Sequence, residues 1–174
     1  MDKVSINQDV RLSEHITLGE VCKTQFKTAD GNIPSRVAIE NLRNICQNWL
    51  EDLRYSYNRL YCLGAGEDYE TSAHVEGIVI NHGFRSPQVS AAMAKAGYHP
   101  SATSNHLTGC AVDIRCRDRE QAIRYASILI DVSHGKKQDF DELIIEWNAS
   151  GSVWLHFAVR PATNRRKVSF MQGS

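Results

Sequence analysis

The sequence lacks several features that would assign it to a particular class of protein. Its 20 Lys and Arg residues equal its 20 Asp and Glu residues, so no net charge draws the chain toward nucleic acid or anionic lipid. No apolar stretch approaches the roughly 20 residues that span a bilayer. The residues from Met1 to Ser5 have no apolar run behind their charges, so a cleavable signal peptide is not expected. These absences favour a chain made in the cytoplasm, with no nucleic-acid partner and no membrane span.

The five cysteines include no CxxC pair, and their number is odd. Both facts argue against a disulfide framework and against a thiolate zinc site. Cys46 lies on an apolar helical stripe, while Cys110 and Cys116 share one face of a predicted strand. We therefore expect these cysteines to be buried thiols.

The length and composition are those of one ordinary domain. A chain of 174 residues that is 42% hydrophobic and 23% charged can bury one core and is short for two. We interpret residues 1–174 as a single domain with its core at about 12–160 and a short C-terminal tail, and we expect a monomer. A small basic cluster in the tail, Arg165 to Lys167, is interpreted as a solvated surface.

Helical periodicity is clearest after Pro34. Apolar residues recur at three- and four-residue steps from Ile39 to Leu53 with polar residues between them, which predicts a long amphipathic helix. Shorter helices are predicted at 17–22, 86–95 and 118–131, the first of them capped by Thr17 and Glu20. The apolar residues expected on the buried side of the last helix are Ala122, Ile123, Ala126, Ile128, Leu129 and Ile130.

Four short β-rich runs predict strands, at residues 77–80, 111–116, 142–147 and 153–159. The last two flank Asn148 to Ser152, which suits a hairpin turn. Helices come mainly before and between strands that pair as hairpins. We therefore expect an α+β domain, a small antiparallel sheet with helices packed on one side.

A histidine and an aspartate stand seven residues apart across a glycine. His106 and Asp113 would supply an imidazole nitrogen and a carboxylate oxygen, which are both good zinc ligands. Residues seven apart on a regular strand face opposite sides, so both reach one ion only if the chain turns between them. We expect that turn at Gly109, with Asp113 then facing away from the core.

The third ligand candidate is His156. The odd positions of the strand at 153–159 are all apolar and belong in the core, which places His156 on the opposite face with Trp154 and Ala158. A lone strand histidine is commonly a structural residue, and its occurrence together with the His106–Asp113 pair favours a shared metal site. Two neutral ligands and one anionic ligand leave zinc an open position, as in catalytic sites, where a water has its pKa lowered to about 7.

The pattern Ser-x-His-x-x-Gly-x-Ala-x-Asp, from Ser104 to Asp113, resembles the signature of the M15 family of zinc D-Ala-D-Ala peptidases. The later Trp-x-His of that family is similar to the stretch from Trp154 to His156. Further segments resemble the branch found in phage lysins and small bacterial carboxypeptidases, so that the similarity covers roughly residues 12 to 160: these are residues 12–18, 41–43 and 83–87. The resemblance implies the hedgehog/DD-peptidase fold and a zinc metallopeptidase. Such an enzyme cuts peptidoglycan stem peptides, as a D-Ala-D-Ala carboxypeptidase or a cross-link endopeptidase.

The resemblance also implies the roles of single residues. The metal ligands for Zn²⁺ fall on His106, Asp113 and His156. Arg85 would bind a substrate carbonyl or carboxylate and the developing oxyanion, which suits a guanidinium that stays charged and donates in a fork. The alternative for Arg85 is a surface salt bridge at a turn. Ser104 would hydrogen-bond near the substrate, with a loop or capping hydroxyl as its alternative.

Relatives often carry the catalytic carboxylate three residues before the last histidine, where this chain has Val153. The replacement we expect is Glu146, in a Leu-Ile-x-Glu-aromatic stretch similar to that of the phage-type branch. A hairpin centred on Ser150 would place Glu146 opposite Trp154, which we also expect at the substrate, and diagonal to His156. Glu146 would then act as general base and pass the proton to the leaving amine, or it would orient a metal ligand instead.

The remaining histidines fit no ligand spacing. They are His15, His74, His82, His99 and His134. We expect His82 to be a surface or capping histidine, and the alternative is that it lines the pocket close to Arg85.

Three hypotheses for function follow from the sequence. The leading one is an enzyme that acts on the cell wall, and the missing signal peptide favours a phage or prophage lysin released through a membrane lesion made by another protein. The second is a catalytically inactive peptidoglycan-binding module that keeps the zinc-site fold, which Val153 supports. The third is a zinc-stabilised structural module of a phage particle.

Overall fold

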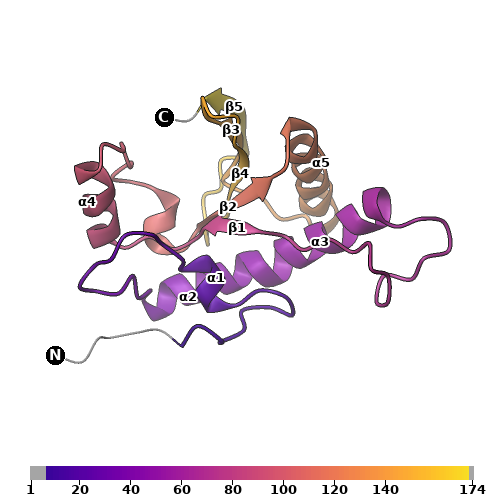
Figure 1. Ribbon diagram of the computed structural model, residues 1–174, viewed down its shortest axis with the longest axis horizontal. Coiled ribbons are helices and arrows are strands. Elements are labelled where there is room, and N and C mark those ends of the chain that lie inside the picture. Colours follow the sequence, from indigo (N-terminus) through magenta and orange to yellow (C-terminus); the bar gives the residue numbers. More distant parts are fainter. Residues whose placement is uncertain (1–6, 173–174) are drawn as a thin grey trace.

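A computed structural model describes residues 7–172. The chain forms an α+β domain around a five-stranded sheet of order β1-β2-β4-β3-β5 (Figure 1). The strands are β1 Ile80–His82, β2 Ala111–Cys116, β3 Glu142–Trp147, β4 Val153–Ala158 and β5 Lys167–Gln172. The helices are α1 Leu18–Val21, α2 Arg36–Ile45, α3 Glu51–Tyr57, α4 Pro87–Lys95 and α5 Arg119–Lys136. A 3₁₀ helix, Asn105–Thr108, precedes β2.

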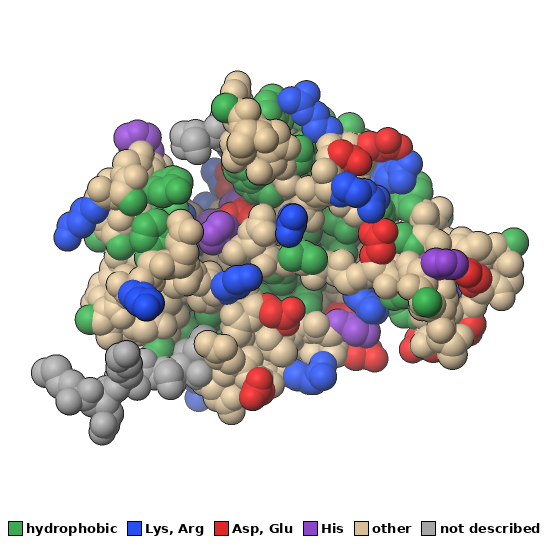
Figure 2. Space-filling view, in the orientation of Figure 1, with side chains coloured by type: hydrophobic (Ala, Val, Ile, Leu, Met, Phe, Trp, Pro, Cys, Tyr) green, Lys and Arg blue, Asp and Glu red, His purple; other side chains and the backbone are tan. Residues whose placement is uncertain are grey.

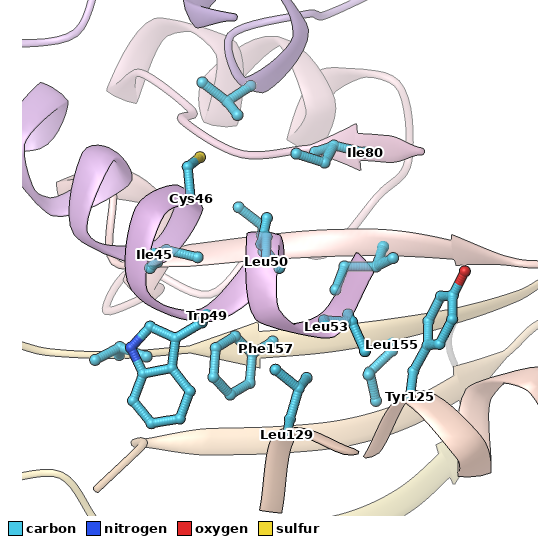
Figure 3. Packing of buried hydrophobic residues seen from close by; sticks show 14 of the residues in the cluster. Ile45, Cys46, Trp49, Leu50, Leu53, Ile80, Tyr125, Leu129, Leu155 and Phe157 are labelled. Atoms are coloured by element: carbon cyan, nitrogen blue, oxygen red, sulfur yellow. The ribbon is translucent and has the colours of Figure 1, made fainter. Parts of the chain in front are cut away.

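The predicted amphipathic helix is longer than the sequence indicated. It runs from Arg36 to Cys62, because α2 and α3 are joined by the π-helical turn Cys46–Leu50 and followed by a second one, Asn58–Cys62. Its buried stripe meets β4 and α5, as Figure 3 shows, and the rings of Trp49 and Phe157 lie 5.2 Å apart. Each large apolar side chain buried in this way contributes about 1.5–3 kcal/mol.

The sheet has one apolar and one polar face. The alternate residues Val153, Leu155, Phe157 and Val159 all belong to the core cluster, as predicted. There α5 packs on β4, and Trp49 of the long helix packs on Phe157. The opposite face carries His156 and looks toward α4, which lies on the other side of the sheet from α5 (Figure 1). The polar face therefore borders a space between the sheet and α4.

Two features of the shorter elements differ from the prediction. The first strand is Ile80–His82 rather than 77–80, and its register against β2 shifts between Ile80 and His82. Ile123 was expected in the core but is 51% exposed. The buried side of α5 follows Ala122 and Ala126, and Ile123 lies about 100° around the helix from Ala122, beyond that stripe. The helix predicted at 118–131 begins as expected, with Asp118 as its N-cap, but it continues beyond residue 131 to Lys136.

The C-terminal tail adds a strand that the sequence analysis did not predict. β5 pairs in parallel with β3, whereas all the other strand pairs are antiparallel, so the sheet is mixed. The basic cluster at its start is not simply solvated, because Arg165 contacts Asp141 and Arg166 contacts Asp139. The tail is thereby joined to the sheet by backbone pairing and by ion pairs.

The helices of the described part of the chain include none long and apolar enough to cross a membrane.

Candidate metal centre

His106, Asp113 and His156 converge on one point at the polar face of the sheet. Each offers one ligand atom, and these atoms all lie within 4.8 Å of one another. Oδ1 of Asp113 is 3.4 Å from Nε2 of His106 and 2.9 Å from Nδ1 of His156. A metal ion with bonds near 2.1 Å separates tetrahedral ligand atoms by about 3.4 Å. The three residues, which the sequence predicted as a set, therefore form a cluster that can hold a small metal ion.

The turn at Gly109 explains how His106 and Asp113, seven residues apart, reach the same point. Asp113 in β2 lies directly opposite His156 in β4, while His106 sits in the preceding 3₁₀ helix. Gly109 ends that helix with φ +70°, a left-handed conformation that favours glycine. A Cβ at this position would also clash with the carbonyl oxygen of Ala38 in α2. The chain therefore reverses where predicted and brings His106 back over the strand.

Hydrogen bonds set the ring orientation of both histidines. Nδ1 of His106 lies 2.6 Å from the carbonyl oxygen of Gly83, which can only accept, so this nitrogen carries the proton and Nε2 faces Asp113. Nε2 of His156 lies 3.5 Å from Oε2 of Glu142, and its Nδ1 faces Asp113. Each ring therefore points one nitrogen at the cluster and has the other engaged by an oxygen, which is the usual arrangement of metal-binding histidines.

The charges of the cluster are strongly coupled. Burial alone would lower the pKa of His156, but hydrogen bonds to Asp113 and Glu142 outweigh it and raise the pKa. Burial likewise works to raise the pKa of Asp113, yet the two histidines hold it well below its usual range. The carboxylate is therefore ionised, and a cation shared between Asp113 and His156 can take the place of the proton that joins them.

A cavity of about 700 Å³ opens in front of the cluster. Figure 2 shows it as a hollow between α4 and the β5 side of the sheet, with histidine and acidic side chains inside. Besides the three cluster residues, its lining includes Arg85, Glu146, Ser104 and Trp154, all of which the sequence singled out. Gln172 and its neighbour Met171 form part of the wall on the β5 side, together with the hairpin.

Arg85 lies at the cavity without a carboxylate partner. Its Nη1 is 3.8 Å from the sulfur of Met93, and its buried Nε has no hydrogen-bond partner within residues 7–172. The salt bridge considered as an alternative is not found for Arg85 in this part of the chain. Burial lowers the pKa of Arg85, while the charge of Asp113 works against that change. A buried donor of this kind is available to an anionic or carbonyl group that enters the cavity.

A residue that the sequence analysis missed holds the turn around Arg85. The buried side chain of Asn32 donates to the carbonyl oxygens of Cys22 and Phe84 at 2.8 and 3.2 Å, and it accepts from the backbone N–H of Ser86 at 2.8 Å. The contact joins segments 54 positions apart, so no local pattern reveals it.

Two glutamates of β3 flank His156. Glu146 pairs with Trp154 and Glu142 pairs with Ala158, so both are diagonal to His156 on the polar face. Burial, followed by the negative charge of Asp113, raises the pKa of Glu146. A hydrogen bond from His156 lowers the pKa of Glu142 to about 2. The position of Glu146 was predicted, whereas Glu142 was missed even though the same strand alternation places it on this face.

Comparison with known proteins finds little. The sequence matches no family model and no curated protein. Among solved structures, the L-Ala D-Glu endopeptidase ChiX of Serratia marcescens is similar, with 21% sequence identity, 72% of this chain and 87% of that chain covered, and a TM-score of 0.36. At this level of similarity, what the site can do has to be derived from its own residues.

Two further residues of the cavity have structural contacts. Ser104 caps the 3₁₀ helix, because its side chain accepts from the backbone N–H of His106 at 3.4 Å. His82 lies opposite Asp113 across β1 and β2, with its Nδ1 3.8 Å from Oδ2 of Asp113 and its ring 62% exposed. His82 therefore lines the cavity, the alternative considered for it, at the edge of the cluster.

Proposed function

We propose that this protein is a zinc-dependent peptidase that hydrolyses peptide bonds of bacterial peptidoglycan. The observation that carries the proposal is the convergence of His106, Asp113 and His156 on one wall of a cavity that Glu146 and Arg85 also line. A set of candidate metal ligands, a carboxylate with a raised pKa and a guanidinium that has no carboxylate partner within residues 7–172 are parts that metal-assisted amide hydrolysis uses.

The donor set favours zinc. Two imidazole nitrogens and one carboxylate oxygen are three protein ligands of the types that zinc prefers, and three ligands leave a position for water or substrate. Zinc bound there would act as a Lewis acid on the scissile carbonyl and would lower the pKa of water to about 7. The protein contributes the orientation of both rings, through Gly83 and Glu142.

Glu146 is the proposed general base. Its carboxylate faces the cavity next to the metal ligands, and burial raises its pKa toward the range in which a carboxylate exchanges protons. Glu142, on the other side of His156, stays ionised and bonded. Two carboxylates with pKa values moved in opposite directions have different tasks. An oxygen of Glu146 would accept a proton from the attacking water and deliver it to the leaving amine.

Arg85 is the proposed substrate-binding cation. With its Nε free of protein partners in the described chain, its guanidinium can donate to the substrate carbonyl or carboxylate and to the oxyanion that develops from that carbonyl. Ser104 and Trp154 line the same cavity and are proposed to contact the peptide beside it. The Asn32 contacts hold the backbone on both sides of Arg85 without any substrate.

The substrate assignment follows from the resemblance to the M15 family. Two of the matching segments contact the 3₁₀ helix of His106: Asn41 donates to the carbonyl oxygen of Thr108 at 2.9 Å, and the carbonyl oxygen of Gly83 accepts from Nδ1 of His106. We infer that the substrate is a peptidoglycan stem peptide, cut at D-Ala-D-Ala or in a cross-link. The protein would be made in the cytoplasm and act on the cell wall, after release during phage lysis.

A second candidate is a binding or phage structural module that keeps the metal site without turnover. The observation that favours it is Val153, which is 8% exposed and belongs to the apolar core. No proton can be exchanged at that position, where relatives carry a carboxylate. The two candidates differ in whether the Glu146 carboxylate takes over the proton transfer that Val153 cannot perform.

Metal analysis together with peptidoglycan digestion tests the proposal. The purified protein should contain about one zinc per chain, and mass spectrometry of digested cell walls should show new peptide termini that disappear with Glu146→Ala. Zinc content should stay the same in that variant. A wild type that holds zinc but releases no fragment would favour the binding module, and stable co-assembly with virion proteins would favour the structural one.

A further inference from the structure

The C-terminal segment 165–172 is connected to the candidate metal ligands through the carboxylate of Glu142. Oε1 of Glu142 lies 3.1 Å from Nη2 of Arg165 and 3.4 Å from Nζ of Lys167. Its other oxygen, Oε2, lies 3.5 Å from Nε2 of His156. One face of the carboxylate therefore contacts the tail, and the other contacts a candidate metal ligand.

Oε2 of Glu142 has another partner, Asn105, which directly precedes the candidate ligand His106. Nδ2 of Asn105 lies 3.2 Å from this oxygen and 2.8 Å from Oδ2 of the buried Asp141. Arg160 donates to Oδ1 of Asn105 at 3.0 Å. Because Asn105 directly precedes His106, the same set of hydrogen bonds reaches both candidate histidine ligands.

The tail also fixes the backbone of β3 next to Glu142. Arg165 donates from Nε and Nη2 to the two oxygens of Asp141, at 2.8 and 2.7 Å, and the backbone N–H of Lys167 donates to the Asp141 carbonyl oxygen at 3.0 Å. β5 then follows β3 in parallel over its whole length. The Glu142 carboxylate is therefore held by contacts with Arg165, Lys167 and Asn105, and its backbone is held by the pairing of β3 with β5.

A carboxylate held in this way decides which nitrogen of His156 faces the cluster. Nδ1 of His156 donates to Oδ1 of Asp113 at 2.9 Å, and a shared cation would replace this proton. The neutral ring would then keep its proton on Nε2, which faces Oε2 of Glu142 at 3.5 Å. Without an acceptor at this place, the imidazole is free to rotate about its side-chain torsions or to adopt the other tautomer. Loss of such an outer partner typically weakens metal binding by about 10–100-fold.

We propose that Glu142 is a positioning residue for His156, and that the C-terminal segment 165–172 acts on the metal site through Glu142. This inference rests on the proposed zinc site. It assigns a role in metal binding to a segment that contains no metal ligand, and it makes β5 part of the active site rather than an appendage of the sheet.

The test compares Glu142→Ala and Glu142→Gln with wild type in the full-length chain. Zinc affinity is measured by competition with a chromophoric chelator. The visible absorption of the Co²⁺-substituted protein reports the ligand geometry independently of activity. The matched control is Arg166→Gln, which removes a cation of the same segment that bonds Asp139 and Ser133 instead of Glu142. Thermal unfolding of each metal-free variant records any general loss of stability.

We expect Glu142→Ala to bind zinc about 10–100-fold more weakly, with an altered Co²⁺ spectrum. Glu142→Gln keeps an acceptor without the charge, so its affinity should lie between those of Glu142→Ala and wild type. Arg166→Gln should bind zinc like wild type. If Glu142→Ala does not fold, the spectrum and affinity of Glu142→Gln decide in its place.

Two results would overturn the inference in different ways. Zinc affinity and Co²⁺ spectra equal to wild type in the Glu142 variants would show that His156 needs no positioning, while leaving the zinc site intact. A wild type that binds neither Zn²⁺ nor Co²⁺ would remove the proposed function itself, and the inference with it. An equal loss in Arg166→Gln would point to general weakening of the tail and would also contradict the role of Glu142.

Discussion

Glu142 and Glu146 occupy the two positions of β3 that are diagonal to His156, one on either side of it. They have the same side chain and the same strand, yet the pKa of one is lowered and that of the other is raised. The difference arises because Glu142 bonds His156 and tail cations, whereas Glu146 is buried beside the negative charge of Asp113. The sheet therefore supplies two carboxylates in different environments, which suits the proposed roles of Glu142 in holding His156 and of Glu146 in moving a proton.

Replacing a cluster residue should abolish metal binding. Asp113→Ala removes the only anionic ligand of the proposed site, so zinc measured by mass spectrometry should fall from about one ion per chain to near zero. Because bound metal stabilises the native state, EDTA should lower the unfolding temperature of wild type and leave that of Asp113→Ala unchanged. His99→Ala, which changes another histidine of the same cavity, is the control and should keep its zinc. Full zinc content in Asp113→Ala would contradict the site.

Replacing the proposed base should affect turnover alone. Glu146→Gln is expected to lower kcat by about 10²–10⁴-fold, the usual contribution of general acid–base catalysis, with zinc content unchanged. The exposed Glu70→Gln serves as the control. A Glu146→Gln variant with wild-type kcat would show that this side chain is not the base.

The pH dependence of wild type should carry the signature of Glu146. A general base must be ionised, and the pKa of Glu146 is raised above its ordinary value of 4.5, so kcat/KM should fall as the pH drops through that raised value. The charged groups that face it are Asp113, which raises the pKa, and His156 and His106, which lower it. The acidic limb of the profile should be absent in Glu146→Gln. Its persistence in that variant would assign the limb to another group.

Arg85 should be sensitive to the shape of its side chain as well as to its charge. Arg85→Lys keeps the charge but loses the planar fork, so we expect kcat/KM to fall about 10–100-fold, a loss of one or two charge-assisted hydrogen bonds. Zinc content should not change, because Arg85 is not a ligand. Arg115→Lys, which lies in β2 beside Trp154, is the control. Equal kinetics for Arg85→Lys and wild type would remove Arg85 from the substrate site.

Gly109 should tolerate no side chain. Gly109→Ala introduces a Cβ at φ +70° and a clash with the Ala38 carbonyl, so it should destabilise the fold by about 2–4 kcal/mol and weaken zinc binding. Gly66→Ala separates the two causes, because Gly66 has φ +82° with nothing near its Cβ position. That control should cost about 1–2 kcal/mol and leave zinc affinity unchanged. Denaturant unfolding and chelator competition measure both effects, and equal costs for the two variants would show that the clash is relieved.

The buried Asp141 should make the free energy of unfolding depend on pH in the acidic range. Burial raises its pKa, but hydrogen bonds from Arg165 and Asn105 outweigh burial and lower it to about 2. A folded-state pKa below the unfolded one gives stability that is present above the ordinary value of 3.8 and is lost as the pH falls through about 2. Asp141→Asn should therefore be less stable than wild type by about 2–3 kcal/mol at neutral pH, and this gap should narrow toward pH 2. Asp139→Asn, at an exposed ion pair, should cost less than about 1 kcal/mol.

Much of the fold and the cluster could be predicted because the patterns are local. Apolar spacing located the long helix, strand alternation placed His156 and Glu146 on one face, and Gly109 marked the turn. The strands at 111–116 and 142–147 have the predicted bounds. In each case a few neighbouring residues hold the information.

Two of the features that were not predicted depend on contacts between distant segments. β5 forms because its backbone pairs with the open edge of β3. Its polar–apolar alternation covers only Lys167 to Phe170, and both apolar side chains, Val168 and Phe170, are exposed. The role of Asn32 depends on the turn at Phe84, which lies 52 positions away. Tertiary pairing of this kind leaves no periodic trace in a single sequence.

The parallel strand β5 has a practical consequence for how the protein is handled. Met171 and Gln172 line the cavity, so a purification tag or fused domain joined directly after residue 172 would begin at the cavity wall. A histidine tag at that place would offer competing imidazoles beside the metal cluster and would crowd incoming peptides. Preparations intended for metal titration or digestion assays should therefore carry no tag directly after residue 172.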